Sequence, residues 1–263
     1  MIRRLLLALA LAASADSAAA QSAAPQTQTP TTRVVDFLPS YDFHLNMEHL
    51  SHDDPRYVWD TNFGGELGLI GFGPSRLTFV ANYEAVLGEE FHPFDPNQGN
   101  YTLEGDLTTR VAGLEFGAVF YHQSRHLGDR PKRQPIDWNM FGARVRKRIA
   151  RGATILDARV DGRGSILTTN VDYRWEVDAG ISGRRQLRPA VDVVGAVNLR
   201  HVGVDGTRDR AGQTGFRGEG GMRFAGRAAA IELFVAVERR IDAYPTEFVP
   251  ATWTSAGMRL LSR

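Results

Sequence analysis

A histidine and a serine, His122 and Ser124, stand two residues apart in the middle of the chain. In an extended strand such residues point to the same face, with about 7 Å between them. A serine hydroxyl at that spacing can hydrogen-bond to an imidazole, the pairing used in nucleophilic acyl transfer. The imidazole needs a third group to orient it. Asn139 is our candidate for that role, with Asp137 as the backup on the same predicted face.

The H-x-S pattern is short, and His49 and Ser51 repeat it elsewhere in the chain. Polar residues at the end of a membrane strand can also have no catalytic role and simply contact lipid headgroups. His126 falls on the same face as the pair if the strand continues. It could then replace His122 as the base, or bind a metal together with Asp129. Pattern alone therefore leaves a catalytic and a purely structural interpretation open.

Alternation of polar and apolar residues indicates the elements that hold these side chains. Residues 170–181 are the clearest case, with one apolar face and one mostly charged face, as period-2 strands have. The apolar faces reach the 9–11 residues that a tilted membrane strand requires. Aromatic residues gather near strand ends, as in interfacial girdles. These features favour an antiparallel transmembrane β-barrel over a soluble β-sandwich.

We count about twelve candidate strands. They cover residues 40–49, 57–72, 76–89, 101–111, 114–125, 137–149, 153–162, 169–183, 189–203, 213–225, 228–240 and 252–262. Short and longer connections alternate between them, as the short periplasmic turns and long outer loops of bacterial barrels do. The first strand and the hairpin over 153–183 carry the weakest pattern, so ten strands remain an alternative.

In this topology the strand over 114–125 ends at the outer rim, so His122, Ser124 and Asn139 are expected on the lipid-facing side. The opposite face of the strands carries Asp, Glu and Arg of balanced sign. Such groups can cross-link the interior into a closed plug or line a narrow solute channel, and the balance favours the plug.

The N-terminal segment and the amino-acid composition predict the cellular compartment of the protein and disfavour several classes of protein. Residues 1–20 have the charged start, apolar stretch and small-residue cleavage site of a signal peptide. Residues 21–38 predict a flexible periplasmic lead-in, and residues 39–263 the outer-membrane β-barrel. The chain has no Cys and a net charge of +1. A disulfide-stapled module, a Cys-ligated metal site and a nucleic-acid-binding protein are therefore disfavoured.

The segment from Tyr121 to Asp129, YHQSRHLGD, resembles the H-Q-S-x-H-L-G-D signature of an uncharacterised family of bacterial outer-membrane proteins. Asp54-Pro55-Arg56 and the stretch over 63–69 are similar to that family as well. The resemblance implies a β-barrel without an established activity.

The same strand pair is similar to the outer-membrane phospholipase A family, whose H-x-S-N-G is followed by W-N on the next strand. The resemblance implies a triad of His122, Ser124 and Asn139, with Trp138 before the asparagine. The chain departs from the family in the residues after Ser124 and in a longer loop to Trp138. Many outer-membrane barrels end in an aromatic residue, and this chain does not. The lipid A deacylases, which use a similar pattern with a Glu, fit less well.

This resemblance also implies cofactors and partners. Calcium is a possible cofactor, with Asp129 or Asp137 as speculative ligands, although the family's calcium-loop pattern is not evident. His49, His52, Asp53 and Asp54 form another group that could bind a divalent cation or be a solvated loop. The expected partners are membrane lipids and the outer-membrane assembly machinery, with a second copy of the chain in a homodimer as a further candidate. Three hypotheses follow: a lipid acyl hydrolase, a structural barrel and a narrow channel.

Overall fold

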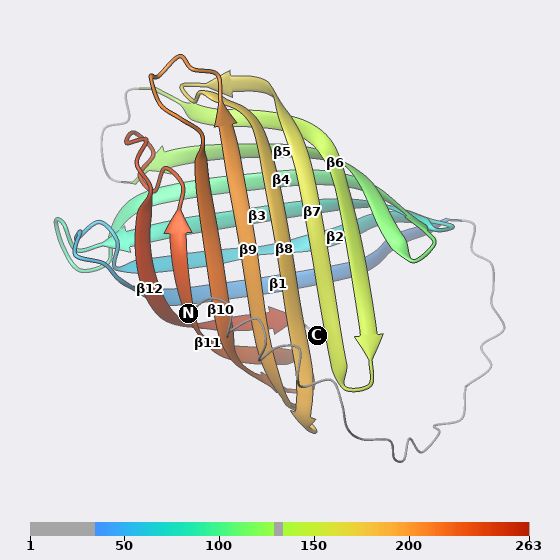
Figure 1. Cartoon of the computed structure of the whole chain (residues 1–263). Helices are drawn as coiled ribbons and strands as arrows, with labels where there is room; N and C mark the ends of the chain where they lie inside the picture. Colours follow the sequence, from blue (N-terminus) through green and yellow to red (C-terminus); the bar gives the residue numbers. More distant parts are fainter. Residues whose placement is uncertain (1–34, 129–133, 263) are drawn as a thin grey trace, which may run out of the picture. The chain divides into compact units, whose positions relative to one another are not determined.

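The computed structural model describes residues 35–128 and 134–262, and this part of the chain forms twelve β-strands. Their bounds are β1 Asp36–Ser51, β2 Trp59–Phe72, β3 Ser75–Gly88, β4 Asp95–Val111, β5 Leu114–Leu127, β6 Ile136–Arg151, β7 Thr154–Thr169, β8 Tyr173–Arg188, β9 Val191–Val204, β10 Gln213–Ala225, β11 Ala229–Arg240 and β12 Ala251–Ser262. Each strand pairs with the next in antiparallel fashion (Figure 1). The predicted twelve-strand count is confirmed.

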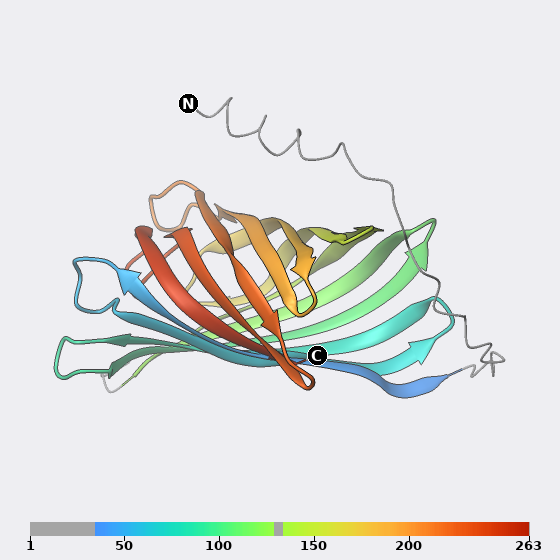
Figure 2. The ribbon, with the colours of Figure 1, turned by 90° about the horizontal axis from the view of Figure 1, so that it is seen from below.

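The sheet closes because β1 pairs with both β2 and β12. The β1–β12 register runs from His44 opposite Leu261 to Ser51 opposite Thr254. Closure leaves no open sheet edge, which is the condition for a sheet to sit in hydrocarbon. Figure 2, turned by 90° from Figure 1, shows the two walls of this single sheet.

Side chains alternate between the lumen and the exterior along each strand. On β5, Phe116 and Phe120 are exposed while Val119 and Tyr121 are buried. The exposed large apolar side chains recur on every strand, so the barrel carries the apolar exterior of a transmembrane barrel. Among the described residues, no helix has the length and apolarity to cross a membrane.

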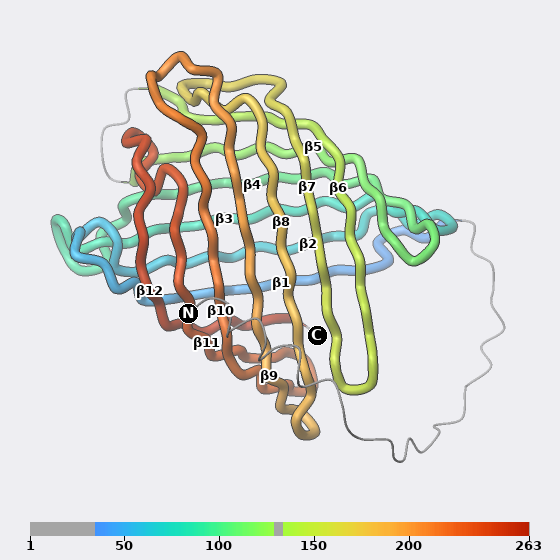
Figure 3. Tube along the Cα trace, in the orientation of Figure 1, coloured from blue at the N-terminus to red at the C-terminus, as the bar shows by residue number. Residues whose placement is uncertain are grey.

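Tight turns join the strands at one end, which we name the short-turn end (Figure 3). Between β4 and β5 the turn consists of Ala112 and Gly113, whose φ angles are 49° and 76°. Positive φ at both central residues is the geometry that matches the twist of a two-residue hairpin. Most of the longer connections lie at the opposite end, which we name the mouth.

Several details of the strand prediction are wrong. β4 begins at Asp95 and not at residue 101, and β8 covers Tyr173–Arg188 and not 169–183. β7 continues to Thr169, so the turn to β8 covers residues 170–172 and not 163–168. Arg163 keeps the strand going, because its guanidinium is buried in the lumen 2.5 Å from a carboxylate oxygen of Glu176. A β-bulge between Tyr173 and Trp175 then turns Tyr173 inward, where an outward position was expected.

The barrel also begins earlier than expected, since β1 starts at Asp36 and takes up the end of the predicted lead-in. The predicted signal peptide over 1–20 and most of the lead-in over 21–38 lie outside the described residues. Asp129, one of the two suggested calcium ligands, lies outside them as well.

Buried ion pairs cross-link the lumen. Arg144 on β6 contacts Glu104 at 2.5 Å and Asp106 at 2.9 Å, both on β4, and Asp161 at 2.6 Å on β7. Such pairing offsets the cost of burying a charge. The predicted cross-linking of the interior by charges of balanced sign is present here.

Other pairs join strands that are not neighbours. Arg217 on β10 contacts Glu48 on β1 at 3.0 Å, and Arg240 on β11 contacts Asp60 on β2 at 2.6 Å. These contacts bridge strands that the sheet itself does not pair.

The connection between β11 and β12, residues 241–250, folds into the mouth, and we name it the mouth loop. Arg125 donates hydrogen bonds to the carbonyl oxygens of Asp242, at 2.6 Å, and Ala243, at 3.1 Å. Arg210 and the Tyr173 hydroxyl hold the Asp242 carboxylate. Two apolar clusters pack around the loop: Leu50, Tyr57, Val86, Ala243, Tyr244 and Trp253, and Tyr121, Trp138, Met140, Tyr173, Val202 and Ile241.

Candidate active site

The antiparallel register of β5 and β6 places His122 directly opposite Asn139. His122 Nδ1 lies 3.0 Å from Asn139 Oδ1, a hydrogen bond in which the imidazole N–H donates to the amide oxygen. Both residues share the outward face with exposed Phe120 and Phe141. With its proton on Nδ1, the ring keeps a lone pair on Nε2. The structure therefore brings together the histidine and the asparagine that the sequence pattern singled out.

Ser124 lies on the same face of β5, next to these two residues. Its hydroxyl is 2.9 Å from Nε2 of His126, so within the described residues its hydrogen bond is to His126 and not to His122. The His126 ring also packs edge-on against Tyr101 at 5.4 Å between centroids. The strand does continue through His126, as the sequence-based alternative required.

Ser124 stands midway between the two imidazoles. His122 and His126 are its same-face neighbours on β5, each two residues away. A serine side chain has three staggered χ1 rotamers separated by low barriers. Rotation about that one bond redirects the hydroxyl, so its hydrogen bond to His126 is one of several orientations open to it.

Asp137 lies opposite Ser124 in the register, and its carboxylate accepts a hydrogen bond from Thr169 Oγ1 at 3.3 Å. Ca²⁺ takes six to eight oxygen ligands. The described residues contain no group of three or more His, Asp or Glu arranged to hold a metal ion. Asp137 alone therefore does not make a calcium site, and we derive no step through a metal.

The support of the site from inside the barrel is what sequence reasoning missed. Arg125, between Ser124 and His126, points into the lumen and holds the mouth loop. Tyr121 and Trp138 precede His122 and Asn139 and belong to one of the apolar clusters of the mouth. The alternation of the two strands contained this signal. Each outward polar residue is preceded or followed by a large inward one.

The second H-x-S pattern lacks an amide partner in the register. His49 lies opposite Trp59 and packs edge-on against it at 4.9 Å between ring centroids. In the nearby loop, His52 Nδ1 accepts a hydrogen bond from the Asp54 backbone, and Asp54 pairs with Arg56 at 2.7 Å. These contacts fit the solvated-loop alternative for that group.

Comparison with known proteins supports the fold. No family model matches the chain, and no curated protein matches it. An active-site mutant of outer membrane phospholipase A from Escherichia coli is similar in structure, with a TM-score of 0.52 and 13% identity over 90% of this chain and 95% of that chain. The Salmonella typhi phospholipase dimer with bound calcium gives 0.50 and 13%, over 85% and 90%. An outer-membrane channel from Pseudomonas putida F1 gives 0.50 and 16%, over 84% and 94%.

These structures share an outer-membrane β-barrel fold, but their names assign them different functions. At 13% to 16% identity the likeness concerns the fold alone. The resemblance to a family with the H-Q-S-x-H-L-G-D signature stays a prediction.

Proposed function

We propose that this chain is an outer-membrane lipid acyl hydrolase with its site on the lipid-facing rim of β5 and β6. The observation that carries the proposal is the hydrogen bond from His122 Nδ1 to Asn139 Oδ1, with Ser124 beside it on the same outward face. An oriented imidazole next to a hydroxyl is the arrangement that activates a serine nucleophile. An outward face also gives the substrate access from the membrane itself.

In the proposed reaction Ser124 Oγ attacks the carbonyl carbon of a phospholipid acyl ester. Its proton passes to Nε2 of His122, while Asn139 holds the ring through Nδ1–H. The protonated imidazole then gives that proton to the departing alkoxide, which leaves an acyl-serine. Water, deprotonated by the same nitrogen, releases the fatty acid and restores the hydroxyl.

His126 has a different role in this proposal. It holds the Ser124 hydroxyl in the rotamer seen here, at 2.9 Å. Asn139 contacts His122, so His122 is the ring with the orienting amide. We infer that the productive rotamer turns Ser124 towards His122 and that His126 stabilises the resting one.

The closed mouth weighs against the channel alternative. The mouth loop is fixed by Arg125, Arg210 and Tyr173, and the ion pairs of Arg144 on β6 reach into the lumen to β4 and β7. The non-enzymatic structural barrel remains the second candidate, and the experiment below separates the two.

The proposal includes the cell location and the partners that the sequence predicts. The chain resides in the outer membrane after removal of residues 1–20, and the assembly machinery inserts it there. The phospholipase dimer with bound calcium supports testing for a homodimer and for calcium dependence, to which Asp129 and Asp137 are the proposed contributors.

The test is hydrolysis of a phospholipid by the purified mature chain in detergent micelles, with calcium or with chelator. We expect the Ser124→Ala variant to lose at least about 10³-fold in rate, as loss of a nucleophile does. The matched control is Ser51→Ala, which removes the serine of the other H-x-S pattern, at the mouth end of β1. Equal rates for wild type and Ser124→Ala would contradict the hydrolase proposal and favour the non-enzymatic structural barrel.

A further inference from the structure

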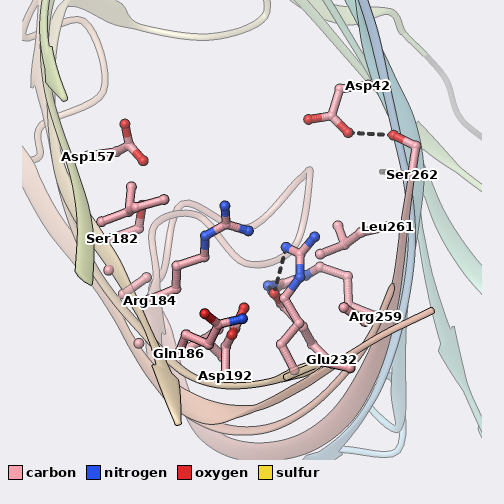
Figure 4. A pocket seen from close by; sticks show the side chains of 18 of the residues that line it. Asp42, Asp157, Ser182, Arg184, Gln186, Asp192, Glu232, Arg259, Leu261 and Ser262 are labelled. Carbon is pink, nitrogen blue, oxygen red and sulfur yellow. Dashed lines mark hydrogen bonds and ion pairs between the residues drawn. The ribbon is translucent and has the colours of Figure 1, made fainter. Parts of the chain in front are cut away.

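Two cavities open into the lumen at the short-turn end. The larger has a volume of about 1020 Å³ and is the one seen in Figure 4. Its charges balance, because five basic residues face five acidic ones: Arg148, Arg184, Arg223, Arg227 and Arg259 against Asp42, Asp157, Asp192, Glu219 and Glu232. Pairs such as Arg259 with Glu232, at 2.9 Å, neutralise its wall.

The second cavity, of about 840 Å³, adjoins the first, since Arg148, Asp157 and Ser182 line both. Its charges do not balance. Six basic side chains line it against three acidic ones: Arg76, Arg110, Arg146, Lys147, Arg148 and Arg159 against Glu66, Glu115 and Asp157. We name this the basic cavity.

The shortage of carboxylates shows in the contacts. Glu115 is shared by three guanidinium groups, at 3.0 Å from Arg76, 3.5 Å from Arg146 and 3.6 Å from Arg110. Arg148 reaches Asp157 only at 3.9 Å, with 62% of its side chain exposed. Arg110 is 71% exposed. Their guanidinium donors are thus left with capacity for a further anion.

Arg159 is neutralised by Asp178 on β8, at 2.7 Å, but the wall facing Arg110, Arg146 and Arg148 presents no charged side chain to the cavity. The residues of β8 and β9 that line the basic cavity are all uncharged: Gly180, Ile181, Ser182, Ala196, Val197 and Asn198. Several are small, which leaves room beside the guanidinium groups. Asp106 contacts Arg146 at 3.4 Å, but it is shared with Arg144, which lies closer at 2.9 Å.

We propose that the basic cavity binds a small water-soluble oxyanion with at least two negative charges, a phosphate or a polycarboxylate. Guanidinium forks match both groups in bidentate geometry. Arg110, Arg146 and Arg148 supply the donors, and Arg76 holds Glu115 in place. The side chains point into the lumen and away from lipid, so the ligand comes from solution. It enters at the short-turn end, because the mouth loop fills the other end of the barrel.

The test is isothermal titration of the full mature chain, in a non-ionic detergent, with pyrophosphate and separately with citrate. We expect one saturable site for at least one of these anions, with weaker binding as salt is raised. The double variant Arg110→Gln with Arg148→Gln is expected to bind at least about tenfold more weakly, since each removes a charged hydrogen bond.

The matched control is Arg185→Gln with Arg188→Gln. It makes the same change in net charge at the same end of the barrel, and neither residue lines the basic cavity. We expect this variant to bind as wild type does. No saturable binding of either anion, or an equal loss in both double variants, would overturn the proposal.

Discussion

At the scale of single residues, the candidate site depends on which imidazole takes the serine proton. His122 is fixed by Asn139, whereas His126 contacts the hydroxyl in the resting rotamer. A base must keep its acceptor nitrogen towards the nucleophile, so the ring that is held through its other nitrogen is the better one.

We therefore expect opposite effects from the two histidines. His122→Ala is expected to lower the rate of phospholipid hydrolysis by at least about 10³-fold, because the general base is lost. His126→Ala is expected to retain most of the rate or to raise it, since the resting rotamer loses its partner. Rate measurements on both variants in the same micelles decide the matter. A larger loss in His126→Ala would make His126 the base.

The sequence predicted the contact of His122 with Asn139, but it left open whether Ser124 contacts His122 or His126. The first follows from antiparallel register, because a hairpin of known turn position fixes which residues stand opposite each other. The second depends on one χ1 angle, and strand periodicity carries no information about a rotamer. Asp137 illustrates the same limit of strand periodicity. The pattern predicted the face of β6 on which Asp137 lies, but not how many metal-ligating groups surround it.

Arg144 is the residue on which the central ion-pair network depends. Its side chain is 1% exposed and faces Glu104, Asp106 and Asp161. Arg144→Met leaves these carboxylates without their cation and is expected to lower the free energy of unfolding by about 3–5 kcal/mol. Arg148→Met, at an exposed pair, is expected to cost less than about 1 kcal/mol. Urea unfolding in micelles measures both, and equal midpoints would contradict a structural role for the network.

At the scale of elements, strands and loops were not equally predictable. Most strands end close to their polar and turn residues, because alternation stops where a strand stops. The largest departures are the start of β4, the end of β7 and both ends of β8. Residues 163–168 were expected to form a connection, yet they continue the strand, which Arg163 anchors in the lumen through Glu176. Ion pairing across the lumen involves residues far apart in sequence, and a local pattern cannot report it.

The predicted strand bounds included the connection that forms the mouth loop, but not its position inside the mouth, because its contacts join residues far apart in sequence. The mouth loop is anchored at its outer edge by Arg56, which contacts Glu247 at 2.6 Å and lies over the ring of Tyr244 at 4.4 Å. The hydrogen bond from Arg56 keeps the pKa of Asp54 below its ordinary value. A carboxylate whose pKa is lowered by folding stabilises the fold above its unfolded pKa, ~3.9. That contribution is lost as the pH falls through the lower, folded pKa.

We accordingly expect acid to loosen the mouth loop. Hydrogen exchange followed by mass spectrometry, corrected for the intrinsic effect of pH, measures protection of the amides of Ala243 and Glu247, which hydrogen-bond within the loop. Protection is expected to fall on acidification through the folded pKa of Asp54. Arg56→Gln is expected to lose protection already at neutral pH and to add little in acid. Protection that does not change with pH in wild type would contradict this anchoring.

At the scale of the whole molecule, the lumen is obstructed at two levels. The mouth loop fills the outer level, with Asp242 only 2% exposed. Beneath it, ion pairs such as those of Arg217 and Arg240 join strands that lie three positions apart around the barrel. Between these levels remain lumen cavities of about 270 Å³ each, whereas the short-turn end holds the large ones. The lumen is therefore closed at the mouth and open at the short-turn end.

This arrangement predicts the electrical behaviour of the barrel. Wild type in a planar bilayer is expected to show no conductance steps above the noise. Replacement of residues 243–249 by two glycines removes the outer obstruction, and the hydrogen bond from Ala243 N to Val249 O, at 3.1 Å, shows that the ends are close enough to join. We expect small steps from this variant, because the ion pairs still narrow the lumen. Conductance in wild type equal to that of the shortened variant would show that the mouth loop does not close the barrel.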